Sequence, residues 1–248
     1  MEGLELKNLS INISDNQNII ENLDLQIQKG SVYVLFGPNG AGKSSLIRAI
    51  GGWPSYNVSS GSIHFNDTDI TSATVDKRAA SGIATAFQLP PEIVGVKLRD
   101  MLKICLSKNP AEKFSDKETS MIESFNLTSF LDRDINVNFS GGEKKRAEIL
   151  QLLFMKPQLM LIDEPDSGVD VQTLQFIGQQ INDYLQTHNC SALIVTHQGN
   201  ILEHVKVDEA LVLVDKQIRC RGHPEKIFDT IKTKGYEECK KCQGKKIR

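Results

Sequence analysis

The segment that most constrains the fold is Gly37-Pro-Asn-Gly-Ala-Gly-Lys-Ser44, which fits the pattern G-x-x-x-x-G-K-[ST]. It follows the apolar run VYVLF at 32–36 and runs into the helix-forming stretch SSLIRAI. Glycines let backbone N–H groups turn around a phosphate, and the helix that follows directs its positive end at the same anion. This strand and helix context favours a phosphate-binding loop over an ordinary glycine-rich turn.

The loop also indicates which atoms would contact a nucleotide. Lys43 is expected to reach the β- and γ-phosphates, and Ser44 to give its hydroxyl to Mg²⁺. A dinucleotide-binding pattern, G-x-G-x-x-G, fails because position 45 is serine. The nucleotide-binding residues predicted in this segment are Gly37, Pro38, Asn39, Gly40, Ala41, Gly42, Lys43, Ser44 and Ser45.

Four nearly continuous apolar runs lie along the chain, at 32–36, 83–87, 159–162 and 192–195. Such runs are typical of strands that are covered on both faces, as in a parallel sheet. Helical patterns lie between the runs, for example a stripe of leucine and isoleucine within 174–185. The order of strand and helix predicts an α/β core with a mostly parallel sheet.

The residues before this core have a different pattern. Apolar side chains alternate from Leu4 to Ile13, with one change of phase near Lys7 and Asn8, and alternate again at 23–27. This alternation predicts two half-buried antiparallel strands, the first with a β-bulge.

The helical arm and the end of the chain complete the predicted organisation. Between 89 and 140 the pattern changes to short amphipathic pieces, about 97–107 and 116–125, with no strong strand, which predicts a helical arm inserted into the α/β core. Residues 1–235 would form one domain. The lysine-rich end at 236–248 has too little apolar surface to offset its ordering entropy and is expected to be a mobile basic tail.

Two adjacent acids, Asp163 and Glu164, follow the apolar run at 159–162. They are expected at the carboxyl edge of the sheet, where the phosphate-binding loop also lies. Asp163 suits a contact with Mg²⁺ through water, and Glu164 suits a general base that polarises the water attacking the γ-phosphate. The alternative is an exposed acid pair at a strand end.

Two further polar residues close strands of the same predicted sheet. Gln88 follows the run at 83–87 and is a candidate contact for Mg²⁺ and the attacking water. His197 follows the run at 192–195 and is a candidate for holding Glu164 and the γ-phosphate in register. A lone histidine or glutamine at a strand end is more often structural or solvated, but their shared position favours a catalytic role.

A second candidate anion site precedes the predicted helix EKKRAEILQLLF. One nucleotide can engage only one of the two sites in a chain, so the economical arrangement is a two-fold dimer with each ATP between 37–44 of one subunit and 140–143 of the other. The alternative is a tight turn that caps a helix, and the charge run at 144–146 is expected to be a solvated face. The residues of this second site are Ser140, Gly141, Gly142 and Glu143.

Composition narrows the choice of partners and compartment. The 29 basic and 31 acidic side chains give a formal charge of -2, which argues against a nucleic-acid binder. The sequence has no apolar run long enough for a membrane helix and no secretory pattern at its start, so we expect a cytoplasmic protein. Five scattered cysteines do not form a disulfide framework, and Cys239-Lys-Lys-Cys242 is half of a metal-binding spacing, with a plain tail as the alternative.

Together these segments resemble the ABC ATPase family, over residues 3 to about 235. The resemblance implies a P-loop NTPase fold with an N-terminal antiparallel β subdomain and an inserted helical subdomain, and it implies ATP and Mg²⁺ as cofactors. In the terms of that family the matching parts are Walker A at 37–44, the Q-loop residue Gln88, the signature segment FSGGE at 139–143, Walker B at 159–163, the catalytic Glu164, the D-loop Ser167–Asp170 and the switch residue His197.

Within the family, the segments FSGGEKKRAEILQL, DEPDSGVD, GGWPSYNVSSG and FQLPPEIVGV are similar to those of the SufC branch, the ATPases of iron-sulfur cluster assembly. This resemblance implies a SufB/SufD-like scaffold protein as the partner, remodelled when two ATPase subunits close around ATP. Two alternatives remain, a nucleotide-binding subunit of a membrane transporter and a non-hydrolysing adaptor. The family often stacks adenine on an upstream aromatic residue, but SINISDNQNII offers none.

Overall fold

The centre of the molecule is a seven-stranded sheet with the strand order β13-β12-β11-β3-β10-β9-β6. It is seen in a computed structural model that describes residues 2–13, 17–240 and 246–247. The strands from β11 to β6 are parallel, whereas β12 is antiparallel to β11. The strands are β3 (Val32–Phe36), β6 (Ile83–Ala86), β9 (Leu159–Asp163), β10 (Ser191–Val195), β11 (Glu209–Val214), β12 (Gln217–Gly222) and β13 (Lys246–Ile247). The four apolar runs are β3, β6, β9 and β10, so the predicted parallel core is confirmed.

Alternate residues of these strands supply two separate cores. Met160, Ile162 and their neighbours pack against α5 (Gly141–Phe154) and α6 (Val171–His188) on one face. Leu159 and Leu161 pack against α1 (Lys43–Gly51) on the other. Because successive side chains of a strand point to opposite faces, a strand that is covered on both faces must be apolar throughout.

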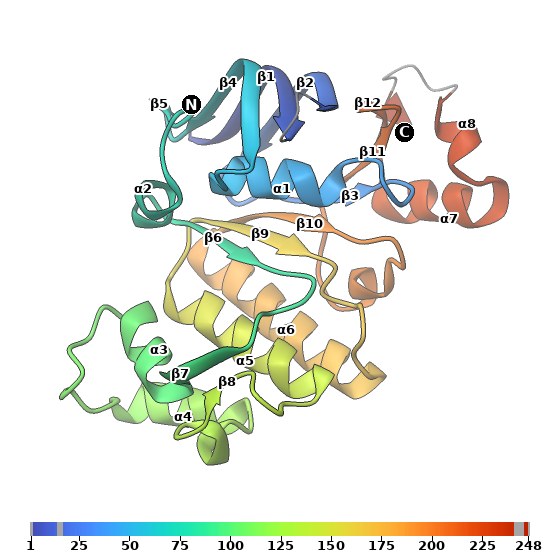
Figure 1. Ribbon diagram of the computed structural model, residues 1–248. Coiled ribbons are helices and arrows are strands. Elements are labelled where there is room, and N and C mark those ends of the chain that lie inside the picture. The colour runs from blue at the N-terminus through green and yellow to red at the C-terminus, as the bar shows by residue number, and fades with distance from the viewer. Residues whose placement is uncertain (1, 14–16, 241–245, 248) are drawn as a thin grey trace.

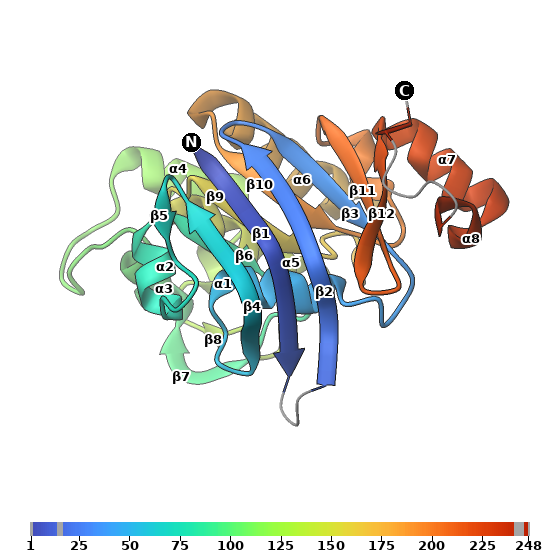
Figure 2. The ribbon, with the colours of Figure 1, turned by 90° about the horizontal axis from the view of Figure 1, so that it is seen from above.

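A second, antiparallel sheet lies beyond α1, so that α1 is enclosed between two sheets (Figures 1 and 2). Its strand order is β2-β1-β4-β5. The register of β1 shifts between Leu6 and Leu9, and Asn8 has a φ of 45° there, which confirms the predicted bulge. The strands are β1 (Gly3–Ile13), β2 (Gln17–Gln28), β4 (Tyr56–Phe65) and β5 (Thr68–Asp69), and α2 (Val75–Ala80) follows them.

The segment 89–140 lies beside α5, at the lower left of Figure 1. The sequence shows no strong strand in this segment, but the structure has a short pair: β7 and β8 pair antiparallel, with Ile93 opposite Ile135. Ser115 and Glu118 form a capping box at the start of α4. The elements of this segment are β7 (Ile93–Lys97), α3 (Leu98–Cys105), α4 (Asp116–Ser124), the 3₁₀ turn Thr128–Phe130 and β8 (Asp134–Ile135).

The end of the chain has more structure than the expected mobile tail. After the 3₁₀ turn Asn200–Glu203 and α7 (Pro224–Lys234), α8 (Tyr236–Lys240) buries Cys239 completely in a small apolar cluster that includes Phe36 of the core sheet. Cys242 lies outside the described residues. Within the described ranges no group of three or more His, Cys, Asp or Glu side chains is placed to hold a metal ion, and no helix is long and apolar enough to cross a membrane.

Arg78 of α2 holds the end of α1 in place. Arg78 is 3% exposed, and its guanidinium donates to the carbonyl oxygens of Ala49 and Ile50, each at 2.8 Å. The same group donates to Thr71 at 2.9 Å and to Ala73 at 2.8 Å. One buried cation therefore bonds four carbonyl groups of the end of α1 and of the loop before α2, of which Ala49 also accepts from the N–H of Gly52.

We expect Arg78→Met to lower the free energy of unfolding by about 3 kcal/mol, because four carbonyl groups lose a charged donor. Equilibrium unfolding in urea measures the change. The exposed neighbour Lys77, changed to Met, is the control, and it should stay within about 0.5 kcal/mol of the parent chain. Equal stability of the two variants would contradict this role of Arg78.

Candidate active site

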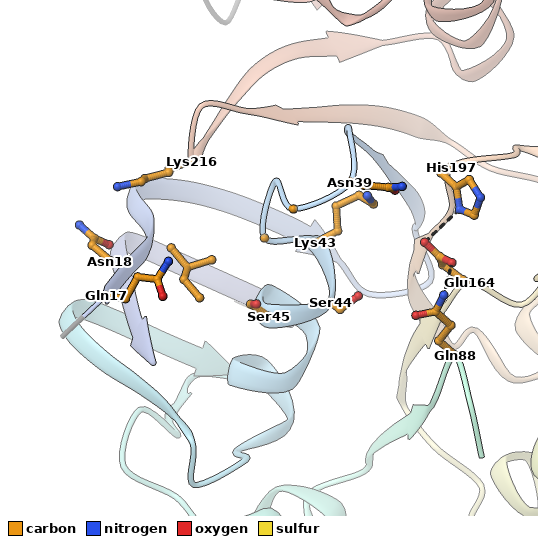
Figure 3. Close-up of a pocket in the computed structure, with 13 residues that line it drawn as sticks. Gln17, Asn18, Asn39, Lys43, Ser44, Ser45, Gln88, Glu164, His197 and Lys216 are labelled. Carbon is orange, nitrogen blue, oxygen red and sulfur yellow. Dashed lines mark hydrogen bonds and ion pairs between the residues drawn. The ribbon is translucent and has the colours of Figure 1, made fainter. Parts of the chain in front are cut away.

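A cavity of about 510 Å³ lies beside the N-terminus of α1 (Figure 3). Its volume is in the range of small-molecule sites. Glu164, Gln88 and His197 lie at one end, and Lys216, Gln17 and Asn18 lie at the other, with the phosphate-binding loop between them. The residues lining it are Gln17, Asn18, Ile19, Asn39, Gly40, Gly42, Lys43, Ser44, Ser45, Gln88, Glu164, His197 and Lys216.

The phosphate-binding loop has a backbone that needs glycine. Gly40 and Gly42 have φ values of 79° and 102°, and a Cβ at Gly42 would lie 2.8 Å from Cγ2 of Ile19. Of the predicted loop residues, Pro38 and Ala41 line a neighbouring hollow together with Tyr236 instead of the main cavity. The shape of the loop therefore depends on glycine at these two positions.

Lys43 lies across this loop. Its Nζ donates to the carbonyl oxygens of Gly37 at 2.8 Å and Pro38 at 3.1 Å. Burial lowers the pKa of Lys43, and the nearby carboxylates of Glu164 and Asp163 act in the opposite direction. A phosphate group in the cavity would give this confined ammonium an anionic partner.

Asp163 does not line the cavity but contacts a residue that does. It is 2% exposed, and its Oδ1 accepts a hydrogen bond from Oγ of Ser44 at 3.0 Å. Burial raises the pKa of Asp163, while the hydrogen bond from Ser44 lowers it. A hydroxyl and a carboxylate are oxygen donors that suit Mg²⁺, and a cation here would stabilise the ionised carboxylate that burial disfavours.

Glu164 is held by two residues that were predicted at the ends of other strands. Gln88 Nε2 donates to Glu164 Oε2 at 2.7 Å, and His197 Nδ1 lies 3.0 Å from Glu164 Oε1 (Figure 3). The backbone of Glu164 has a φ of 47°, which is uncommon for a non-glycine residue, and its N–H donates to the carbonyl oxygen of Val195 at 2.8 Å. The structure therefore brings all three candidate catalytic residues together.

A buried hydrogen bond, missed by the sequence analysis, joins the loop after Glu164 to the loop that carries His197. Thr196 is fully buried, and its hydroxyl lies 2.8 and 2.9 Å from the two carboxylate oxygens of Asp166. The hydroxyl oxygen also accepts from the N–H groups of Gln198 and Gly199. No sequence motif marks this link, because its two residues follow different strands and meet only in the folded chain.

The second candidate anion site lies outside this cavity, at the start of α5. Ser140 and Glu143 form a capping box, in which the N–H of Ser140 donates to Glu143 Oε2 at 2.7 Å. A Cβ at Gly141 would lie 2.6 Å from the carbonyl oxygen of Gly168, so this helix start is packed tightly on the loop after Glu164. The segment therefore caps a helix, which is the alternative to an anion site given above. Within one chain it does not contact the phosphate-binding loop.

Sequence analysis missed other residues around the cavity. Lys216 forms an ion pair with Glu21 at 2.8 Å, and Asn18 Nδ2 donates to Glu21 at 3.0 Å, so that β2 and the turn after β11 form one polar wall. No motif marks these positions. The charge run at 144–146 was expected to be a solvated face, which is wrong for Lys145, a residue only 2% exposed.

Known proteins resemble this chain in sequence. The family model described as ABC transporter matches residues 20–167. A protein named "Probable ATP-dependent transporter ycf16" from Trieres chinensis is 36% identical, over 94% of this chain and 96% of its own. "Iron-sulfur cluster assembly protein SufC" from Plasmodium falciparum is 35% identical, over 95% of this chain and 70% of its own.

The fold has solved counterparts as well. The ADP conformation of an ATP-binding cassette of an ABC transporter matches with a TM-score of 0.75 and 26% identity, over 96% of this chain and 98% of that one. The family match, the relatives and the shared fold lead to one conclusion. The chain belongs to the ABC transporter family, has the α/β fold of its ATP-binding cassettes, and is an ATPase.

Proposed function

We propose that this ATPase dimerises around ATP and drives a conformational change in a SufB/SufD-like scaffold protein during iron-sulfur cluster assembly. The observation that carries the hydrolytic part is the contact of Glu164 with both Gln88 and His197 beside the phosphate-binding loop. The similarity to a SufC protein over 95% of this chain supports the part in cluster assembly. The motifs FSGGEKKR and DEPDSGVD support it further.

In the proposed mechanism the chain supplies position and charge rather than a covalent intermediate. The loop at 37–44 holds the triphosphate through backbone N–H groups, and the ammonium of Lys43 interacts with the negatively charged β- and γ-phosphates. Glu164 polarises the attacking water as a general base, while Gln88 and His197 keep its carboxylate oriented. Three residues would hold Mg²⁺, namely Ser44, Gln88 and Asp163, and the ion would supply positive charge beside the phosphate oxygens.

The separation of two helix starts in one chain supports the dimer. The start of α1 lies at the cavity, whereas the exposed start of α5 lies outside it. A two-fold dimer would place Ser140–Glu143 of one subunit against the nucleotide held by the other. Each ATP would then be contacted by two helix N-termini, both of which favour an anion.

A membrane-transporter subunit is the second candidate, because several relatives carry the name of a probable ATP-dependent transporter. In both candidates a partner is needed, and the segment 89–140 carries exposed apolar side chains that it would contact. Leu89, Val94 and Ile104 are 83%, 80% and 65% exposed. The two candidates differ in the partner, a scaffold in one and a permease in the other.

Lys43→Ala should weaken ATP binding on the order of 100-fold, because it removes a charge-assisted contact with phosphate oxygens. Isothermal titration of ATP measures the dissociation constant. Lys117→Ala, an exposed lysine of α4, is the matched control and should bind as the parent chain does. An unchanged affinity in Lys43→Ala would contradict the assignment.

Glu164→Gln should slow phosphate release by at least about 100-fold while ATP still binds, since the amide keeps the shape but cannot act as a base. The variant should also accumulate an ATP-bound dimer, which size-exclusion chromatography with ATP detects. Glu123→Gln on the exposed face of α4 is the control. Full turnover in Glu164→Gln would refute the role of this residue.

The partner is tested by affinity purification from native extract followed by mass spectrometry. We expect a soluble SufB/SufD-like scaffold to be recovered, and its recovery should fall in Leu89→Asp/Val94→Asp, whose ATP affinity should be that of the parent chain. Recovery of a multi-span permease alone would overturn the role in cluster assembly and favour the transporter. ATP hydrolysis by the isolated chain is independent of this outcome.

A further inference from the structure

An ion pair buried in α5 has no part in the mechanism above. Lys145 Nζ lies 3.0 Å from Glu148 Oε2, and the two side chains are 3% and 8% exposed. Burial raises the pKa of Glu148, and the ammonium of Lys145 acts against this shift. A buried pair of this kind contributes little net stability, because desolvation offsets most of the attraction between the charges. Its presence calls for an explanation other than stability.

Both members of the pair contact the same residue of another element. Glu148 Oε1 accepts a hydrogen bond from the N–H of Phe87, and Lys145 Nζ donates to the carbonyl oxygen of Phe87 at 2.6 Å. The two polar groups of Phe87 are therefore fixed by two charged groups of one helix. The ring of Phe87 also packs edge-on against Trp53, with the ring centroids 5.2 Å apart.

Phe87 directly precedes Gln88, whose side-chain amide donates to Glu164 at 2.7 Å. The helix that carries the pair begins at the capping box of Ser140 and Glu143, little more than one turn before Lys145. Because α5 is a continuous helix, its start and the Lys145–Glu148 pair move together. The pair thus connects the second anion site to the residue that orients the general base.

We propose that Lys145 and Glu148 are positioning residues for ATP hydrolysis, which hold Gln88 against Glu164 by fixing the backbone of Phe87. The inference rests on the proposed roles of Gln88 and Glu164. It assigns no contact with nucleotide to either residue of the pair. Loss of the pair therefore leaves the phosphate-binding loop intact but lets Gln88 drift from Glu164.

The test is the double variant Lys145→Met/Glu148→Leu, which replaces the ion pair by apolar side chains of similar size. Replacing an ion pair by apolar side chains is often neutral in itself, but the N–H and C=O groups of Phe87 lose their partners, so we expect the melting temperature to fall by about 5 °C. We expect kcat to fall on the order of tenfold, as a small misplacement of a catalytic group does, with KM for ATP within about twofold of the parent value. A purely structural pair would leave kcat unchanged when it is measured well below the melting temperature.

A second measurement asks whether the pair acts through Gln88. Gln88→Ala alone should lower kcat, and adding it to the double variant should lower kcat little further, because both changes remove one and the same interaction. The matched control is Glu209→Leu/Arg221→Met. Glu209 is buried to a similar extent, with 7% of its side chain exposed, and pairs with Arg221 at 2.6 Å, but it lies at the opposite end of its strand from the cavity. The control should keep the parent kcat.

The possible failures are distinguishable. If Gln88→Ala leaves kcat unchanged, the proposed role of Gln88 fails and this inference fails with it. If Gln88→Ala lowers kcat but the double variant does not, only the role of Lys145 and Glu148 is overturned. The same holds if the combined variant shows the product of the two separate losses of kcat. If the double variant does not fold, Glu148→Gln takes its place, because the amide keeps the shape of the side chain. We expect the same loss of kcat from it and little further loss when Gln88→Ala is added.

Discussion

The parallel pairing of β3, β10 and β9 is the constraint on which the rest of the structure depends. In this pairing Val195 lies opposite Leu35 on one side and Asp163 on the other, so the three strands end level with each other. The residues that follow them are the phosphate-binding loop, His197 and Glu164, which therefore meet at one edge. Backbone hydrogen bonds within the sheet, rather than contacts among the polar side chains, bring these groups together.

Those parts of the site that follow local patterns were predictable from the sequence. The loop at 37–44 carries its own motif, and Gln88, Glu164 and His197 each follow an apolar strand, so their common edge follows from the parallel sheet. The bulge at Asn8 was visible as a change of phase in the alternation. Each of these signals is contained in a few consecutive residues.

The parts that escaped prediction depend on distant contacts. β8 has two residues and pairs across a long stretch of chain, so it leaves almost no local pattern. Lys145 stands in a charge run, which normally indicates a solvated surface, and only its contacts with Glu148 and Phe87 account for its burial. The helix α8 was missed because one turn with Tyr236 and Cys239 supplies the whole apolar face.

The contact between Gly141 and Gly168 leaves no room for even a methyl group. The start of α5 and the loop after Glu164 are therefore in direct backbone contact within one subunit. In the proposed dimer these two segments border different nucleotides, because the helix start would face the partner's ATP while Glu164 acts on the subunit's own. A displacement of the helix start by one nucleotide would therefore press directly on the loop that follows the general base of the other site.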